Sequence, residues 1–298
     1  MRRPDVCTSE IRILFAPAAV KSTKSRADPH AAGAGQRVII TGATSGIGAA
    51  LARRYARQNA TLGLIARRKP ELEQLAAQLA GNNEIYPLDV RDAAALAAAE
   101  ENFVARHGSP DVVIANAGVS VGTLTDYADD TCVFRDVLDV NVIGMVNTFQ
   151  PLLAAMREAG RGSLVGIASV AGYRGLPGGA AYCASKAAAI TYLESLRVEL
   201  KTSGVKVITL CPGYVATPMT AQNPYPMPFL LSADEAAEKI VAIIARGSSY
   251  AVIPWQMAIV ARCLRIVPNW LYDALFARAP RQSRRGHRER GSERRHPD

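Results

Sequence analysis

The chain has 298 residues, of which 49% are hydrophobic and 20% are charged, values typical of a soluble globular protein with one large domain or two small ones. No apolar run reaches the roughly 20 residues that cross a bilayer, and the five cysteines are scattered, without a CxxC pair or a Cys/His cluster. These features argue against a membrane span, a metal site and a disulfide framework, and they favour a reducing, cytoplasmic location.

The net charge of +9 lies mainly at the two ends of the chain. Residues 1–35 carry +3 and residues 278–298 carry +5, so the rest is nearly neutral. Basic ends can bind nucleic acid or anionic lipid, but solvated ends are the simpler interpretation. We predict no nucleic-acid partner, a disordered extension over 1–35 and a disordered basic tail over 280–298. A targeting segment and a misassigned start site are the alternatives for 1–35.

The first predicted strand, 37–41, leads through a glycine-rich turn into a helix that extends to about residue 58. Gly42, Gly46 and Gly48 give the turn the spacing Gly-x-x-x-Gly-x-Gly. Between a strand and a helix, such glycines permit a tight turn, close approach of a pyrophosphate, and close packing of the helix on the strand. The helix N-terminus adds free N–H groups for the anion. The sequence therefore predicts a dinucleotide site here.

Apolar strands and helices then alternate along the chain. Six further strands are predicted at 61–66, 85–88, 111–115, 163–168, 205–210 and 250–253, and the helices between them at 69–80, 92–107, 131–158, 180–203 and 232–245. Because the strands carry few charges, helices should cover both faces of the sheet. With right-handed crossovers, residues 36–253 should form a doubly wound, three-layer α/β fold of the Rossmann type with a seven-stranded parallel sheet.

The residues after the second strand indicate which dinucleotide is bound. In folds of this kind an acid about 20 residues past the glycines binds the ribose 2′-hydroxyl of NAD. Here the position reads Ala66-Arg67-Arg68, with no acid to repel a 2′-phosphate. Arg67 can bind that phosphate through charge-assisted hydrogen bonds, so we predict NADP(H) rather than NAD(H). The alternative is that both arginines cap a loop in solvent.

Tyr182 and Lys186 are four residues apart on a predicted helix, so their side chains share one face. A nearby ammonium favours the phenolate and lowers the phenol pKa from its usual value of about 10. Ser169 follows the strand 163–168, at the sheet edge where ligands bind in open α/β sheets. The three residues together suggest carbonyl chemistry. Each alone is more typical of packing, a surface charge or a strand-end cap.

In order and spacing, these motifs resemble the short-chain dehydrogenase/reductase superfamily over about residues 36–253. The motifs are Thr41-Gly-Ala-Thr-Ser-Gly-Ile-Gly48, Asn116-Ala-Gly118, Asn141, Ser169, Tyr182-x-x-x-Lys186 and Pro212-Gly213. The chain departs from the family pattern in two places. Ala115 stands where many members carry another Asn, and Ser45 stands where some NADP enzymes carry Lys or Arg, so Arg67 should supply the specificity largely alone.

The resemblance implies a role for each catalytic residue. Tyr182 would give its proton to the carbonyl oxygen as a hydride arrives from the nicotinamide. Lys186 would lower the pKa of Tyr182 and bind the nicotinamide ribose. Ser169 would polarise the substrate oxygen, and Asn141 would hold a water that links Lys186 to solvent as a proton relay.

The resemblance also implies a set of cofactor contacts. Asp89 would bind the adenine, Asn116 would pin the central strands beside the cofactor, and Thr217 would contact the carboxamide or the pyrophosphate. The implied cofactor-binding residues are Gly42, Thr44, Ser45, Gly46, Ile47, Gly48, Arg67, Asp89, Val90, Asn116, Ala117, Gly118, Tyr182, Lys186, Pro212, Gly213, Val215 and Thr217.

Two apolar segments lie outside these motifs. Residues 218–231 are rich in proline and follow the sixth strand. We expect them to form a substrate lid that, with Leu176-Pro177, favours an apolar ketone or aldehyde; simple packing is the alternative. Residues 254–279 predict a helical extension, broken at Pro268, with Asn269 capping its second helix. Packing on the domain or on a sister subunit is favoured for it, and peripheral membrane contact through 255–298 is the alternative.

The sequence therefore predicts an NADP(H)-dependent oxidoreductase that interconverts an apolar carbonyl compound and its alcohol. One alternative is a 3-oxoacyl-thioester reductase. Another, from a different class, is a non-catalytic nucleotide-sensing or membrane-peripheral protein on the same fold. The family resemblance implies self-association through the helices at 131–158 and 180–203. Because the C-terminal extension would block some tetramer contacts, we predict a homodimer, with a tetramer as the alternative.

Overall fold

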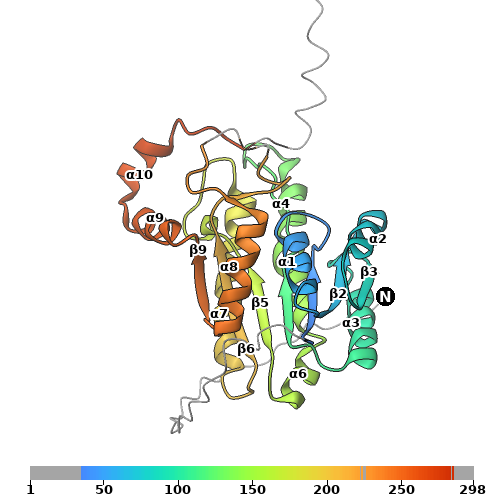
Figure 1. Ribbon diagram of the computed structural model, residues 1–298. Helices are drawn as coiled ribbons and strands as arrows, with labels where there is room; N and C mark the ends of the chain where they lie inside the picture. Colours follow the sequence, from blue (N-terminus) through green and yellow to red (C-terminus); the bar gives the residue numbers. More distant parts are fainter. Residues whose placement is uncertain (1–34, 222, 224–225, 283, 285–298) are drawn as a thin grey trace, which may run out of the picture.

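The computed structural model describes residues 35–221, 223, 226–282 and 284 (Figure 1). All but the last residue of the predicted extension over 1–35, and most of the predicted tail over 280–298, lie outside the described residues. The chain between them folds as the alternating pattern predicts, with a C-terminal helical pair packed at one end.

Seven parallel strands form one central sheet, as predicted. From edge to edge they are β3 (Asn83–Pro87), β2 (Thr61–Ala66), β1 (Arg37–Thr41), β4 (Val112–Ala115), β5 (Ser163–Ile167), β6 (Lys206–Pro212) and β9 (Tyr250–Ile253). Ile39 of the central strand β1 pairs with Gly63 of β2 and with Val113 of β4. The strand order reverses beside β1, and this reversal opens a crevice at the carboxyl ends of β1 and β4.

Helices cover both faces of the sheet and give the predicted three-layer, doubly wound fold (Figure 1). The helices of one face are α1 (Gly46–Ala56), α2 (Lys69–Gln78) and α8 (Ala233–Arg246), and those of the other include α3 (Ala93–His107) and α7 (Ala180–Glu199). A hydrophobic core lies on each face of the sheet. Val38 and Ile40 of β1 are buried in the first core, on the side of α1, α2 and α8, and Ile39 is buried in the second core, on the side of α3 and α7. Because successive side chains of a strand alternate between two buried faces, the strand is a continuous apolar run.

The single helix predicted over 131–158 is interrupted after Phe149. Its first part runs without a gap through α4 (Asp130–Leu138), a π-helical turn η1 (Asp139–Ile143) and α5 (Gly144–Phe149), and its second part is α6 (Leu153–Ala159). Pro151 lies between α5 and α6, where its missing N–H and its ring disfavour a continuous helix. The π turn contains Asn141, and such turns inside helices are frequent at functional sites.

A short two-stranded ribbon closes the segment that follows β6. Its strands are β7 (Val215–Ala216) and β8 (Leu231–Ser232), which pair in parallel. α8 begins at the predicted cap, where Ser232 Oγ accepts a hydrogen bond from the Glu235 amide (3.2 Å) and Glu235 Oε2 accepts one from the Ser232 amide (2.8 Å). This reciprocal capping box fixes both the start of α8 and the end of the segment predicted to be a lid.

The C-terminal extension is a pair of helices, α9 (Trp255–Ile266) and α10 (Asn269–Phe276), as expected. The predicted capping role of Asn269 is wrong: Asn269 is the first residue of α10, and its Oδ1 instead accepts a hydrogen bond from Arg174 (2.9 Å). Pro268 takes the cap position. In the part of the chain that the structure describes, no single helix is long and apolar enough to cross a membrane, although the bent pair Asp130–Phe149 and Leu153–Ala159 meets the criterion of length and composition.

Glu100 on α3 is a charged residue inside the second core. Its side chain is 1% exposed, and neither carboxyl oxygen has a hydrogen-bond partner among the described residues. Burial raises the pKa of Glu100 to about 9, well above the value of about 4.3 expected in an unfolded chain. The folded state therefore binds this proton more tightly than the unfolded state, and stability falls as the pH rises between the two pKa values.

We predict that Glu100→Gln stabilises the protein in a pH-dependent way. At pH 5 the variant and the parent should differ little, whereas at pH 8 the variant should gain on the order of 2–4 kcal/mol because it has no proton to lose. Urea unfolding at the two pH values measures the difference. Glu101→Gln, at an exposed position of the same helix, is the matched control and should change neither value. An equal gain for Glu100→Gln at both pH values would contradict the assignment.

Candidate active site

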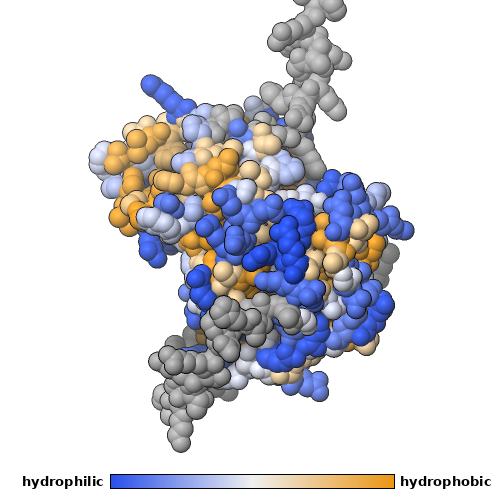
Figure 2. All heavy atoms as spheres, viewed as in Figure 1, coloured by the Kyte–Doolittle hydropathy of each residue, from blue (hydrophilic) through white to orange (hydrophobic). Residues whose placement is uncertain are grey.

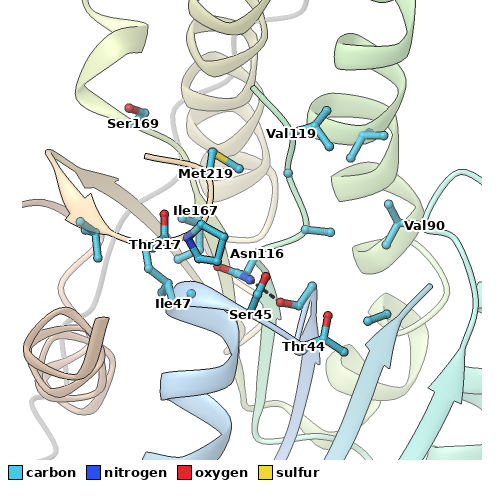
Figure 3. Close-up of a pocket in the computed structure, with 18 of the residues that line it drawn as sticks. Thr44, Ser45, Ile47, Val90, Asn116, Val119, Ile167, Ser169, Thr217 and Met219 are labelled. Carbon is cyan, nitrogen blue, oxygen red and sulfur yellow. Dashed lines mark hydrogen bonds between the residues drawn. The ribbon is translucent and has the colours of Figure 1, made fainter. Parts of the chain in front are cut away.

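A cavity of about 410 Å³ opens at the carboxyl ends of the central strands (Figure 3). Of the residues predicted for catalysis and cofactor binding, all but Gly48 and Asn141 line it. Side chains from the start of α1, from the end of β5 and from the segment after β7 converge there, as the labelled Ser45, Ile167 and Thr217 illustrate in Figure 3. Pro218, Met219 and Thr220, from the segment predicted to be a lid, also line the cavity. The lining residues that the sequence did not assign are Ala66, Arg68, Leu88, Val119, Val140, Ile167 and Ala168.

The glycine-rich turn between β1 and α1 forms one wall of the cavity. Gly46 has a φ of +53°, and a Cβ there would lie 2.9 Å from Cγ2 of Thr217. Gly48 does not line the cavity, but a Cβ on it would lie only 2.2 Å from the Gly42 carbonyl oxygen and 2.6 Å from Nδ2 of Asn116. The first turn of α1 carries no acidic residue, so no carboxylate of this turn competes for its free N–H groups. This cradle fits a pyrophosphate.

Asn116 connects the ends of the two central strands beside this cradle. Its Nδ2 donates to the carbonyl oxygens of Thr41 and Gly42 at 3.0 and 3.1 Å. The hydroxyl oxygen of Thr41 accepts hydrogen bonds from the amides of Asn116 and Ala117, at 3.1 and 3.2 Å. The turns after β1 and β4 are therefore fixed to one another, although sequence analysis assigned no role to the Thr41 hydroxyl.

Two arginines and one carboxylate lie at the end of β2. Arg67 is largely exposed, with Nη1 3.8 Å from Oδ2 of Asp89. Arg68, to which sequence analysis gave no part in cofactor binding, lines the cavity and donates to Oγ1 of Thr44 at 3.3 Å. Hydrogen bonds from Arg91 lower the pKa of Asp89 and keep it ionised. The end of the cavity beside β2 therefore presents two guanidinium groups, suited to an additional phosphate.

Ser169, Tyr182 and Lys186 line the other end of the cavity. Lys186 is 4% exposed, its Nζ donates to the carbonyl oxygen of Ile167 (2.8 Å), and it lies 5.8 Å from the centroid of the Tyr182 ring. Burial lowers the pKa of Lys186 to about 8. Ser169 Oγ accepts a hydrogen bond from the Ala171 amide at 3.1 Å, which holds the serine at the end of β5.

Asn141 lies behind this cluster rather than in the cavity wall. Its Oδ1 accepts from the Val119 amide (2.8 Å), and its Nδ2 donates to the Val119 carbonyl oxygen and to Oγ of Ser185, both at 2.9 Å. A Cβ on Gly118 would lie 3.3 Å from Oδ1 of Asn141 and 3.6 Å from Nζ of Lys186, so both side chains approach Gly118 closely. Asn141 therefore holds the loop after β4 against α7. Its predicted water relay stays a prediction.

A buried thiol and two phenols adjoin the cluster, and sequence analysis assigned none of them. Sγ of Cys211 lies 3.1 Å from the hydroxyl of Tyr250, which in turn lies 2.6 Å from the hydroxyl of Tyr173. Burial raises the pKa of Cys211 to about 11, although the positive charge of Lys186 acts to lower it. The thiol is therefore neutral and acts as a polar neighbour of the ammonium. No sequence signal marks this contact, because three separate elements supply its residues.

The segment predicted to be a lid begins against the cavity, since Pro218, Met219 and Thr220 line it. Oγ1 of Thr220 donates to the Val215 carbonyl oxygen at 2.6 Å and fixes this start. Residues 222, 224 and 225 of the segment lie outside the described residues. Leu176-Pro177 does not line the cavity, so this predicted wall is not brought to the site.

Gln282 and Arg284, predicted to belong to a disordered tail, make defined contacts. Nε2 of Gln282 donates to Oγ of Ser120 at 2.9 Å. Arg284 donates to both carboxyl oxygens of Asp130, at 2.8 and 2.9 Å, and its guanidinium lies 3.4 Å from the centroid of the Tyr127 ring. The structured part of the chain therefore reaches at least to Arg284 and lies across the loop after β4.

Residues 36–226 match the family model described as short chain dehydrogenase. The chain belongs to this family. An oxidoreductase of Myxococcus xanthus is 42% identical over 243 residues, which cover 80% of this chain and 96% of the relative. The ketoacyl reductase HetN of Nostoc is 35% identical over 194 residues, which cover 63% of this chain and 67% of HetN.

A solved structure is similar as well. The alcohol dehydrogenase from the archaeon Thermococcus sibiricus, complexed with 5-hydroxy-NADP, has a TM-score of 0.66 and 27% identity, over 73% of this chain and 95% of that one. This chain is therefore an oxidoreductase of the short-chain dehydrogenase family, whose members bind NAD(P)(H). Within the described residues, no three His, Cys, Asp or Glu side chains are grouped to hold a metal ion, and the four described cysteines are free.

We predict that Gly48→Ala weakens dinucleotide binding at least tenfold and destabilises the protein by about 2 kcal/mol or more, because the added Cβ meets backbone. Titration of the protein with NADPH, followed by the fluorescence of the nucleotide, and urea unfolding measure the two effects. Gly175→Ala is the matched control, since a Cβ there meets nothing within 4 Å, and it should change neither. Parent-like NADPH binding by Gly48→Ala would contradict the proposed role of the close approach.

Proposed function

We propose that this protein is an NADP(H)-dependent oxidoreductase that interconverts an apolar ketone or aldehyde and the corresponding alcohol, with Tyr182 as the acid and base. One observation carries the proposal: Ser169, Tyr182 and Lys186 line one end of a cavity whose other parts are a glycine cradle and a pair of arginines. The nicotinamide of a bound dinucleotide and the carbonyl group of a substrate would meet beside Ser169, Tyr182 and Lys186. We also propose a cytoplasmic homodimer formed through α4–α6 and α7.

When bound, the reduced nicotinamide supplies a hydride to the carbonyl carbon. The phenol of Tyr182 donates its proton to the carbonyl oxygen, and the hydroxyl of Ser169 donates a hydrogen bond to the same oxygen. Lys186, charged at neutral pH, stabilises the phenolate that Tyr182 leaves behind. It uses one of its three N–H donors on the Ile167 carbonyl oxygen, which keeps the ammonium beside the ring. Oxidation of the alcohol runs through the same steps in reverse.

Two observations support NADP(H) as the cofactor. Arg67 and Arg68 both line the cavity at the end of β2, where a 2′-phosphate would need cationic partners. The similar alcohol dehydrogenase from Thermococcus sibiricus was solved with an NADP analogue. The sequence pointed to Arg67 alone, and Arg68 adds a second guanidinium.

A second candidate function is the reduction of a 3-oxoacyl thioester. The similarity to the ketoacyl reductase HetN of Nostoc favours it, and the same three catalytic residues would serve. The two functions differ only in what lies beyond the reacting carbonyl. Comparing turnover of a 3-oxoacyl thioester with that of a simple apolar ketone of equal chain length separates them.

We predict that Tyr182→Phe lowers kcat for carbonyl reduction by at least a factor of a thousand, because the proton donor is lost while the ring that packs beside Lys186 is kept. Binding of NADPH should change less than threefold. Steady-state kinetics and a fluorescence titration measure the two quantities. Tyr192→Phe, at another tyrosine of α7 that does not line the cavity, is the control. A Tyr182→Phe variant with parent-like turnover would overturn the mechanism.

We predict that Arg67→Asp weakens NADPH binding by roughly 10- to 100-fold, the loss expected for charge-assisted hydrogen bonds to a phosphate. NADH binding should stay constant or tighten, because the new carboxylate can accept from the ribose hydroxyl. The ratio of kcat/KM for the two cofactors measures the change, and Arg57→Asp, exposed at the end of α1, is the control. If the ratio were unchanged in Arg67→Asp and also in an Arg67→Ser/Arg68→Ser variant, the NADP(H) assignment would be wrong.

A further inference from the structure

Large apolar side chains gather on the outside of α9 and α10. They are Trp255, Ile259, Ile266, Trp270, Leu271 and Leu275, which we call the C-terminal apolar surface. Ile266 is 80% exposed and Trp270 is 73% exposed. Figure 2 shows hydrophobic residues collected over these two helices, whereas hydrophilic residues cover much of the rest of that face. Exposed apolar residues are normal one at a time, but a continuous patch indicates a binding surface.

The exposed residues lie on a definite face of α9. Trp255, Ile259 and Ile266 are spaced four and seven residues apart and therefore share one side of the helix. Met257 and Ala261, on another side, are 4% and 2% exposed and pack inward. The helix therefore buries one apolar side in the protein, and its second apolar side is exposed.

The two helices are fixed to the protein rather than loosely attached. Arg174 donates to the carbonyl oxygens of Leu264, at 2.6 Å, and of Val267 at the end of α9, and its guanidinium lies 3.9 Å from the centroid of the Tyr272 ring. The Tyr272 hydroxyl donates to the carbonyl oxygen of Gly175 at 2.6 Å. The C-terminal apolar surface is therefore held in one orientation by a network at the junction of the helices.

The segment that carries this surface also carries exposed arginines. Arg262 and Arg265 are exposed on α9, and Arg278 and Arg281 are exposed just after α10. From Trp255 to Arg284 the sequence contains a single acidic residue, Asp273. These helices are too short to span a bilayer, and they carry tryptophan, aliphatic side chains and arginine. This composition is typical of a segment that lies in the interface of an anionic membrane. A symmetric contact with a second copy would instead bring the same arginines of both copies together.

The inner side of α9, opposite to the C-terminal apolar surface, packs against the wall of the cavity. A Cβ on Gly213, which lines the cavity, would lie 2.6 Å from Cγ of Met257 on the inner side of α9. The segment between β7 and β8 adds three exposed apolar side chains, those of Met219, Phe229 and Leu230, and Met219 also lines the cavity.

We propose that α9 and α10 bind this protein to the surface of an anionic lipid bilayer without crossing it. Trp255, Ile259, Ile266, Trp270 and Leu275 enter the headgroup region, and the neighbouring arginines pair with lipid phosphates. Resting on the function proposed above, the same contact places the mouth of the cavity beside the lipid, so that an apolar carbonyl compound dissolved in the membrane reaches the site without crossing water.

The chain itself supplies the reporter for a test, because its only two tryptophans, Trp255 and Trp270, both lie on this surface. The full chain is titrated with vesicles of phosphatidylglycerol and phosphatidylcholine. We expect the tryptophan emission to shift to shorter wavelength, to be quenched by brominated lipid, and the protein to sediment with the vesicles. Vesicles of phosphatidylcholine alone should bind at least tenfold more weakly, since each basic residue near an anionic surface contributes about 1 kcal/mol.

Two sets of variants separate the apolar and the cationic parts. Ile259→Asp/Ile266→Asp should weaken binding to anionic vesicles at least tenfold, whereas Val198→Asp, at an exposed apolar position of α7, should not. Arg262→Gln/Arg265→Gln should lower the preference for anionic lipid by about tenfold or more. Arg157→Gln/Arg197→Gln, which removes two exposed arginines from α6 and α7, should leave it unchanged.

Absence of both emission shift and sedimentation with anionic vesicles would overturn the proposal. So would self-association of the parent that Ile259→Asp/Ile266→Asp abolishes without any effect of vesicles, since the surface would then bind a second copy. Reduction of a water-soluble ketone without vesicles is measured in parallel, and Ile259→Asp/Ile266→Asp should retain it. If the protein binds vesicles but reduces no carbonyl compound, the membrane contact is supported and the proposed function is wrong.

Discussion

The close approach of α1 to the turn after β1 is the contact on which the rest of the site depends. Gly48 leaves so little space against the Gly42 carbonyl oxygen and the Asn116 amide that no side chain fits. Asn116 in turn joins the end of β4 to that of β1. The N-terminus of α1 is thereby aimed at the crevice where the strand order reverses, which is where a pyrophosphate needs it. One tight contact sets the positions of helix, loop and cavity together.

The reactive end of the cavity is organised by burial and by backbone groups. Lys186 donates a hydrogen bond to the Ile167 carbonyl oxygen, and its burial lowers its pKa to about 8, close to neutral pH. Asn141 reaches the same region from behind, through Val119 and Ser185. An ammonium kept partly desolvated beside a phenol is a stronger electrostatic influence than the same pair in water. Positioning by buried neighbours is therefore as important here as the identity of the catalytic residues.

The sequence predicted the sheet and the layers, because apolar strand periods, glycine spacing and strand-end positions are local signals, and with the family resemblance it predicted most of the cavity lining. It failed where several elements act together. The helix predicted over 131–158 is interrupted, and only Pro151 gave a local sign of this. The contact of Cys211 with Tyr250 joins two strands 39 residues apart. Arg284, expected in a solvated tail, pairs with Asp130, a partner 154 residues away that no spacing rule identifies.

The central claim is that the cavity binds NADP(H) and reduces a carbonyl group. The most direct measurement is the oxidation of NADPH by the purified full-length protein, followed by the loss of nucleotide absorbance, with a set of apolar ketones and aldehydes of graded size. We expect saturable NADPH binding and turnover that rises with the apolar surface of the substrate. A folded protein that neither binds NADPH nor oxidises it with any member of the set would contradict it.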